Sequence, residues 1–448
     1  MMENRSEMWD RKRLLRLIIP LVIEQILAVT IGMADTVMVS SAGEAAVSGI
    51  SLVDSINILL INIFSALATG GAVIGAQYLG KRERDSACEA AKQLVLSIAA
   101  LSLVIAAFVL VAKDWLLQII FGHVEQAVMA NAQVYFFLSA LSYPFLAVYN
   151  AGAALFRAMG NSKISMLISA LMNVINIIGN AILIFGFHLD VAGAGIASLI
   201  SRIVGCVLIM LLLIRPIHEI YIKSLLPLKI DWGMIRNIMR IGVPNGLENG
   251  MFQIGKILVQ GLISSFGTAA IAANAVAGNI ASLEIIPGSA LGMAMITVVG
   301  QCVGARDYEG AKRYVKKLMI ITYIFMAILN IPLLFIIPQL VGFYNLSGEA
   351  LAMATEILIL HGTCAIFIWP ASFALPNALR AANDVKFTMI VAILSMWICR
   401  IGMSYLLAQF FNMGVMGVWI AMIIDWCVRA VFLVSRYLSG KWKTKQYI

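Results

Sequence analysis

Charged side chains are scarce in this chain: aspartate, glutamate, lysine and arginine together make up 12% of its 448 residues, whereas 61% are hydrophobic. A soluble globular protein carries about twice that charged fraction, so the composition excludes one. The apolar runs exceed the roughly 20 residues that a helix needs to span a bilayer. The two-residue alternation that marks an outer-membrane barrel is weak. The sequence therefore predicts an all-α polytopic membrane protein.

Cysteine is also sparse, and no two cysteines lie close together in the sequence. This spacing excludes a disulfide framework and a cysteine-rich metal site, and it favours small core residues instead. His361 likewise has no neighbouring metal ligands, so we expect a packed histidine and no metal site beyond a candidate Na⁺ site. The six cysteines are Cys88, Cys206, Cys302, Cys364, Cys399 and Cys427.

A nucleotide-binding loop is missing too. The glycine-rich segment 70–80, GGAVIGAQYLG, ends an apolar run and lacks the lysine of a phosphate-binding loop. Its glycines permit close helix approach instead. We therefore expect no ATP-driven step and no cofactor. The first apolar run is too long for a cleaved signal peptide, so we expect it to be retained as the first span.

The apolar runs divide into twelve predicted spans. Lysine and arginine occupy every second connection between them, and the alternate connections hold only Lys113. This asymmetry predicts that both termini are cytoplasmic, which requires an even number of spans. It also accounts for the net charge of +9 without nucleic acid as a partner. The spans are 14–39, 47–79, 90–112, 130–157, 163–187, 190–214, 236–265, 272–304, 314–338, 350–378, 386–410 and 412–438.

The chain repeats itself with a shift of 223 or 224 residues. Apolar composition inflates chance matches, but it does not easily align arginine, glutamate, glutamine and proline at nearly one spacing. The matches include Arg16 with Arg240, Pro20 with Pro244, Glu24 with Glu248, Gln77 with Gln301, and Arg157 with Arg380.

The repeat predicts two domains and a linker: a first six-helix lobe at 1–214, a basic cytoplasmic linker at 215–235, and a second lobe at 236–448. Each repeat has an even number of spans, so both enter the membrane in the same sense. The lobes are then related by a pseudo-twofold axis along the membrane normal. Two such lobes predict a central cavity that opens to either side by rocking.

Asp35 is the most informative single residue. Apart from Glu24, it is the only charge in the apolar run from Leu17 to Ser41. A charge at mid-membrane costs several kcal/mol, so helices that carry one normally direct it at a partner or a water-filled cavity. No basic residue of the first lobe lies at its depth. Asp35 is therefore a candidate ion or proton site, and Pro20 on the same helix is a candidate conformational bend.

A group of asparagines accompanies this acid. Asn173, Asn176 and Asn180 are spaced to share one helix face. Two interpretations stay open: hydrogen bonding that joins helices, or an oxygen-lined cavity shared with Asp35. The second half lacks the cluster, which favours the cavity. Val259, Cys399, Met403 and Met422 stand where the first half has Asp35, Asn176, Asn180 and Ser198.

Other intramembrane charges lie at matching depths and form three candidate buried pairs. Either they are structural, or they line a cavity. Glu248 has no obvious partner, and it joins the Arg400 group or faces a substrate. Glu248, Lys256 and Glu284 are thus candidates for a substrate cavity in the second lobe, while Asp54, near a span end, is expected to be interfacial. The candidate pairs are Glu24 with Arg202, Arg400 with Asp425, and Lys256 with Glu284.

Several motifs together resemble the multidrug and toxic compound extrusion (MATE) family, bacterial or archaeal type. They are IIPLVIEQ and MADTVMVSSAGEAAVSG in the first span, then GAQYLGKRERDSA and FRAMGNSK, echoed by VGQCVGARDYEGA and LRAANDVK. The resemblance covers essentially the whole chain. It implies two six-helix lobes that export organic cations against a sodium or proton gradient.

The resemblance also implies a cation site for H⁺ or Na⁺ in the first lobe. Some relatives have a second aspartate where Asn180 stands, so the choice of coupling ion stays open. Carried over by motif, the site residues are Asp35, Tyr135, Asn176, Asn180 and Ser198.

These observations together predict a secondary antiporter in the cell membrane, not an enzyme, working by alternating access and expected to act as a monomer. Its partners would be small organic cationic or amphiphilic compounds and the lipid bilayer. One alternative is a flippase or exporter of a lipid-linked or other amphiphilic metabolite, which favours a strongly basic cavity. A passive channel and an integral membrane enzyme are more remote, and the clustered His or Asp motifs of the latter are not visible.

Overall fold

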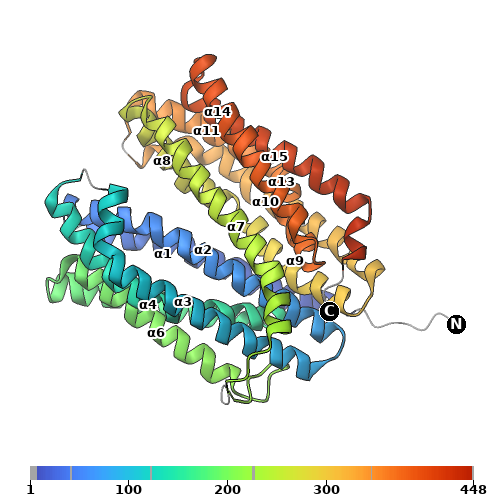
Figure 1. The fold of residues 1–448 in the computed structure, drawn as a ribbon. Helices are drawn as coiled ribbons and strands as arrows, with labels where there is room; N and C mark the ends of the chain where they lie inside the picture. The colour runs from blue at the N-terminus through green and yellow to red at the C-terminus, as the bar shows by residue number, and fades with distance from the viewer. Residues whose placement is uncertain (1–7, 41–42, 122–123, 225–227, 345, 446–448) are drawn as a thin grey trace. The chain divides into compact units, whose positions relative to one another are not determined.

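The computed structural model describes residues 8–40, 43–121, 124–224, 228–344 and 346–445, with the backbone alone at 30–37, 39–40 and 44. Regular structure in these ranges is entirely helical (Figure 1). The chain divides into two compact units, Met1–Gly246 and Leu247–Ile448. The boundary falls inside one helix, α7, which begins in the first unit and continues into the second.

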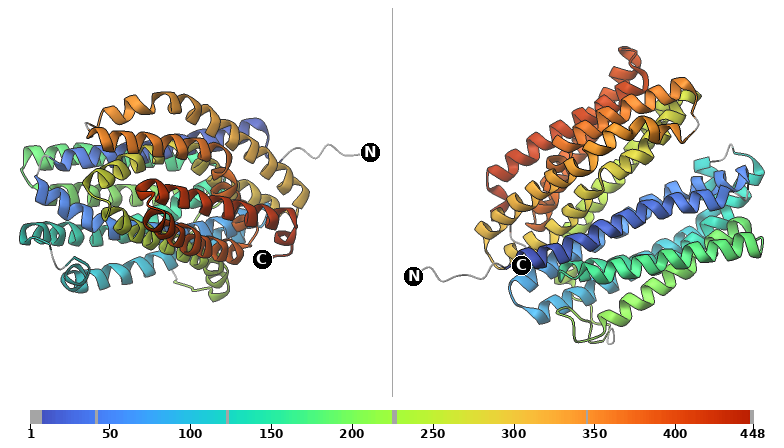
Figure 2. Two further views of the ribbon diagram at one scale, coloured as in Figure 1. Left: turned by 90° about the horizontal axis from the view of Figure 1, so that it is seen from above. Right: turned by 180° about the vertical axis from the view of Figure 1, so that it is seen from behind.

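The first unit is a bundle in which α2 packs against α4, and α4 also packs against α3 and α6. The helix α1 lies along α5, and Figures 1 and 2 show this blue helix running beside green ones. Large buried side chains of α4, among them Phe136, Tyr143 and Phe156, place that helix at the core. The helices are α1 (Arg11–Ser40), α2 (Glu44–Gly80), α3 (Arg84–Phe121), α4 (Gln126–Ala158), α5 (Ser162–Asn180), its π-helical continuation η1 (Ala181–Gly186) and α6 (Asp190–Leu213).

The helices of the second unit are more interrupted, because the π-helical turn η2 joins α11 to α12, η3 joins α13 to α14, and η4 follows α14. π-Helical turns are rare in proteins as a whole, but those that occur are often found at functional sites. From α7 onward the helical elements are α7 (Trp232–Ser264), α8 (Thr268–Glu284), α9 (Ile286–Gly304), α10 (Tyr308–Gly342), α11 (Gly348–Phe367), η2 (Pro370–Ala374), α12 (Leu375–Ala381), α13 (Val385–Leu394), η3 (Ser395–Gly402), α14 (Met403–Tyr405), η4 (Leu406–Phe410), α15 (Gly414–Leu438) and the 3₁₀ turn η5 (Lys441–Thr444).

Ten of the twelve predicted spans coincide with helices in the described ranges that are long and apolar enough to cross a membrane. The first and seventh coincide with α1 and α7. Each of these helices carries arginines in its first ten residues and a glutamate further on, which lowers its mean hydropathy. Several helices exceed their predicted spans; α3, for example, covers 84–121 where 90–112 was expected. Polar ends continue the helix because its hydrogen bonds remain favourable beyond the apolar run.

The backbone confirms the repeat at its turns. Left-handed backbone angles, which are unfavourable for residues other than glycine, recur 224 residues apart. The π-helices η1 and η4 also occupy equivalent positions in the two repeats. The equivalent φ angles are 98° and 97° at Gly43 and Gly267, 64° and 56° at Arg82 and Arg306, and 52° and 54° at His188 and Asn412.

Gly267 offers a test of this shared turn geometry. Its backbone, with φ 97° and ψ 176°, lies in a region that is essentially restricted to glycine. A Cβ there would meet no atom within 4 Å, so the penalty for Gly267→Ala comes from the backbone alone. We expect a loss of about 1–3 kcal/mol in the free energy of unfolding, measured by thermal unfolding of the purified protein.

The matched control is Gly261→Ala within α7, where a Cβ also meets nothing within 4 Å and φ is not positive. Alanine is favoured over glycine inside a helix, so this variant should be at least as stable as the parent. Equal melting temperatures for the two variants would contradict the turn assignment.

Candidate functional site

Three of the predicted cation-site residues form a hydrogen-bonded chain in the first unit. The Asn176 side-chain amide donates to Ser198 Oγ at 3.0 Å, which joins α5 to α6. The Asn180 amide donates to Asn176 Oδ1 at 3.3 Å, one helical turn away. Asn176 and Asn180 are both buried. These three side chains supply amide and hydroxyl oxygens, which suit a hard cation, and they also join α5 to α6.

Asp35 is the predicted acid of this site, and its side chain lies outside the described residues. Its backbone belongs to α1, which packs against α5 and also contacts α6 and η1. The helix that carries the acid therefore lies against the helix that carries the asparagines. Pro20 lies inside the same helix, one turn before Glu24.

Tyr135, the fifth predicted residue, contacts the acid Asp54 on α2. It packs on a small apolar cluster that includes Ile50 and Ile184. Its hydroxyl is hydrogen-bonded to the carboxylate of Asp54.

Asp54 belongs to a polar network that sequence reasoning missed, which we call the Asp54 network and define as Asp54, Asn57, Tyr135, Ser139 and Tyr143. The Asn57 amide donates to Asp54 Oδ1 at 3.1 Å and to Ser139 Oγ at 3.2 Å. The Tyr143 hydroxyl donates to Asn57 Oδ1 at 2.7 Å. The i, i+3 spacing of the acid and the amide on α2 was the only signal for it.

Arg202 faces this network, so its predicted pairing with Glu24 is wrong. Its guanidinium donates to Ser142 Oγ on α4 and is close enough to attract the Asp54 carboxylate. Depth along a helix had suggested the pairing. Depth alone does not give the direction in which a side chain points around the helix, and Arg202 points toward α4.

Glu24 instead takes part in an ion pair that occurs once in each repeat. Glu24 Oε1 lies 3.1 Å from a terminal nitrogen of Arg157, and its other oxygen accepts from Ser165. The equivalent Glu248 Oε1 lies 2.6 Å from Arg380. Both pairs join the first helix of a repeat to the end of its fourth span. All four residues were already matches in the sequence repeat, a signal that had not been used for pairing.

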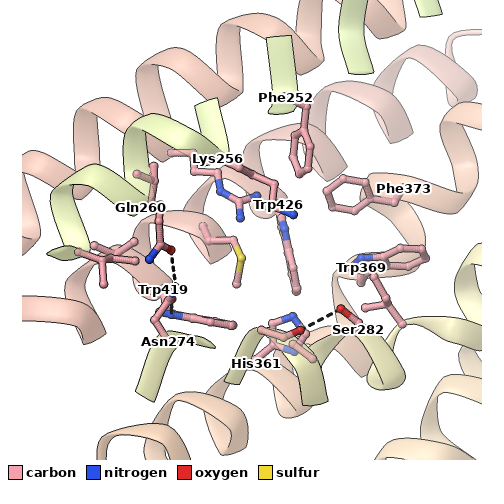
Figure 3. A pocket seen from close by; sticks show the side chains of 18 residues that line it. Phe252, Lys256, Gln260, Asn274, Ser282, His361, Trp369, Phe373, Trp419 and Trp426 are labelled. Carbon is pink, nitrogen blue, oxygen red and sulfur yellow. Dashed lines mark hydrogen bonds between the residues drawn. The ribbon is translucent and has the colours of Figure 1, made fainter. Parts of the chain in front are cut away.

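The second unit contains a cavity of about 330 Å³ among α7, α8, α11, η2, η3 and α15 (Figure 3). Its walls are largely aromatic, and polar side chains from α7, α8, α11 and η3 reach into it. Of the three predicted cavity residues, Lys256 lines it. The principal lining residues are Phe252, Trp369, Phe373, Trp419, Trp426, Lys256, Gln260, Asn274, Ser282, His361 and Arg400.

The two predicted glutamates lie outside this lining. Glu248 pairs with Arg380, as described above, and Glu284 is fully buried behind the cavity and bonded to His361. The predicted pair of Lys256 with Glu284 is therefore wrong. Glu284 ends α8 and faces α11, whereas Lys256 on α7 faces the cavity. His361 is packed, as expected, with Trp426 at 5.1 Å between ring centroids.

The predicted ion pair of Arg400 with Asp425 is wrong as well. Asp425 pairs with Arg429, one turn further along α15, at 2.9 Å. The guanidinium of Arg400 lies over the Phe252 ring, 5.1 Å from its centroid. A spacing of four residues on one helix places Asp425 and Arg429 on the same face, so a local partner prevailed over the one expected from depth.

The profile of the MatE family matches residues 20–182 and again residues 244–406. These two segments amount to well over half of the chain. The chain belongs to the MatE family. The matches begin 224 residues apart, which confirms the internal repeat, and the family is one of transporters rather than enzymes.

Full-length likenesses accompany the family match. This MatE chain is 27% identical over 435 residues to "Uncharacterized transporter YisQ" of Bacillus subtilis, covering 95% of this chain and 94% of that protein. It is 25% identical to "Probable multidrug resistance protein NorM" of Thermotoga maritima, covering 97% and 94%. A solved structure described as "Crystal structure of MATE in the bent conformation" matches with a TM-score of 0.88 at 20% identity, covering 97% and 96%. That likeness concerns the fold, and it confirms the predicted all-α, two-lobe class.

The repeated ion pair provides a stability test. Arg380→Met leaves the Glu248 carboxylate buried without its cation, which typically costs about 3–5 kcal/mol. We expect a markedly lower melting temperature, and partial recovery in the double variant Glu248→Gln/Arg380→Met, because the double change also removes the stranded charge.

Lys312→Met is the matched control, because its pair with Glu309 is exposed and should contribute nothing measurable. A double variant that is less stable than Arg380→Met would show that the two side chains do not depend on each other.

Proposed function

We propose that this chain is a secondary antiporter that exports amphiphilic organic cations in exchange for H⁺ or Na⁺. The observation that carries the proposal is the asparagine–serine chain beside the helix of Asp35, which the second repeat replaces with Cys399, Met403 and Met422. If the cluster served only to pack the helices, both repeats would tend to have it. A function confined to one unit accounts for its presence in one repeat only.

The proposed mechanism rests on competition for negative charge at Asp35. Burial disfavours an ionised carboxylate, so a proton or Na⁺ arriving from outside would neutralise it. The neutralised site would bind an organic cation less well, or α1 would rearrange at Pro20 and reduce the space available. Differential binding of ion and substrate would then bias the inward-open and outward-open states in opposite directions.

We further propose that the transporter lies in the cell membrane with both termini cytoplasmic and functions as a monomer. The alternation of basic and nearly uncharged connections supports this orientation. The relatives named as multidrug resistance proteins support small-molecule substrates.

The deciding experiment is transport in proteoliposomes with proton and sodium gradients imposed independently, using a panel of fluorescent organic cations such as ethidium. We expect accumulation to follow at least one of the gradients. Transport that responds to neither gradient would overturn the coupling.

Asp35→Asn tests the residue itself. The amide keeps the shape of the side chain but can no longer exchange charge, so we expect ion-coupled efflux to be lost while the protein remains folded in the membrane. Asp114→Asn is the control, because Asp114 is an exposed acid paired with its neighbour Lys113, and it should retain full transport. Full efflux by Asp35→Asn would remove Asp35 from the mechanism.

One observation favours the alternative of an exporter for an anionic amphiphile, namely the basic side chains of the second unit's cavity. The same proteoliposomes distinguish the two functions when they contain a fluorescent lipid. Lipid movement between leaflets without cation efflux would favour the flippase.

A further inference from the structure

The cavity of the second unit is lined by positive charge. Lys256 on α7 and Arg400 on η3 both reach it, and neither aspartate nor glutamate is among its lining residues. Within the described part of the chain, neither cationic head group forms a hydrogen bond or an ion pair. They are close enough to repel each other. Lys256 is exposed and Arg400 is half-buried, so a ligand that enters the cavity can reach both. Because like charges repel each other, an anion bound between them would be favoured.

The acids behind the cavity wall do not neutralise these cations. Asp425 attracts Arg400, but it already pairs with Arg429, which repels Arg400. Glu284 is bonded to the imidazole of His361 on the far side of the ring wall. Arg400 and Arg429 therefore share the carboxylate of Asp425, and Lys256 lies close to Arg400. A surplus of positive charge faces the cavity.

Flat aromatic rings form much of the remaining wall, together with aliphatic side chains such as Val259 and Met422. Trp369 stacks on Phe373 with 5.2 Å between ring centroids, and Trp419 and Trp426 both meet His361 edge-on. The Trp419 ring is also held in place by polar bonds: its indole nitrogen donates to Asn274, which donates to Gln260 (Figure 3). Such walls suit a planar apolar body, because aromatic rings stack with defined geometry.

We propose that this cavity binds an aromatic organic anion of one or two fused rings. Its carboxylate or sulfonate lies between Lys256 and Arg400, and its ring body lies against the tryptophan walls. A volume of about 330 Å³ is at the small end of ligand pockets. It suits a small planar ligand better than a lipid-linked head group. This site is independent of coupled cation export in the first unit.

The test uses three ligands of one shape and different charge: 2-naphthoate, 2-naphthamide and 2-naphthylmethylammonium. Binding to the purified full-length protein is followed by calorimetry and by quenching of tryptophan fluorescence. We expect naphthoate to bind about tenfold more tightly than the amide, as a charge-assisted contact would allow, and the ammonium compound to bind most weakly.

Lys256→Met should abolish most of the preference for naphthoate while leaving the affinity for naphthamide unchanged. Lys256→Arg should keep the preference, and Lys316→Met, which removes an exposed cation outside the cavity, should not alter it. Trp419→Ala should lower the affinity for all three ligands by a similar factor, since it removes part of the aromatic wall and leaves the charges in place.

The inference is overturned if the ammonium compound binds more tightly than naphthoate, or if Lys256→Met leaves naphthoate affinity unchanged. The outcome is separate from that of the transport assay. Asp35→Asn should bind naphthoate normally even where its efflux is lost, and a protein that exports ethidium but does not distinguish the three naphthalenes would refute only the anion site.

Discussion

The cost of placing a charge among apolar helices constrains every ionisable side chain described here. Glu24, Glu248 and Asp425 each pair with an arginine, and Glu284 pairs with His361. These contacts explain how a largely apolar bundle tolerates so many ionisable groups. Against this background, a charge without a protein partner among apolar helices indicates a functional role.

The duplicated scaffold carries different chemistry at equivalent places. The turns with positive φ and the Glu–Arg pairs recur in both repeats, so they serve the architecture that both repeats need. The asparagine–serine chain occurs in the first unit only, and around the position equivalent to Asn176 the second unit places Cys399 and Arg400. One unit thereby presents neutral oxygens and the other presents cations, which accounts for two proposed sites of opposite preference.

Much of the architecture was predictable because it follows from local composition. Apolar run length and the alternation of basic connections predicted the spans, and aligned Pro20, Glu24 and Arg157 predicted the repeat. The site was predictable only in part. Asn176, Asn180 and Ser198 do meet, since a shared helix face brings two of them together. The Asp54 network was missed, because it depends on α2 and α4 meeting across more than 80 residues of sequence.

The amino-acid sequence by itself determined that this chain spans a membrane, that it is a duplication, and that charges lie within its helices. Those properties depend on the length of apolar runs and on the spacing of residues, and both can be read along the sequence alone. Only the tertiary structure decided which charges are neutralised. Lys256 and Arg400 lie 144 positions apart in the sequence and line one cavity because α7 and η3 face the same space. The rotation of each helix about its axis sets that arrangement, and it is fixed by packing against all its neighbours at once.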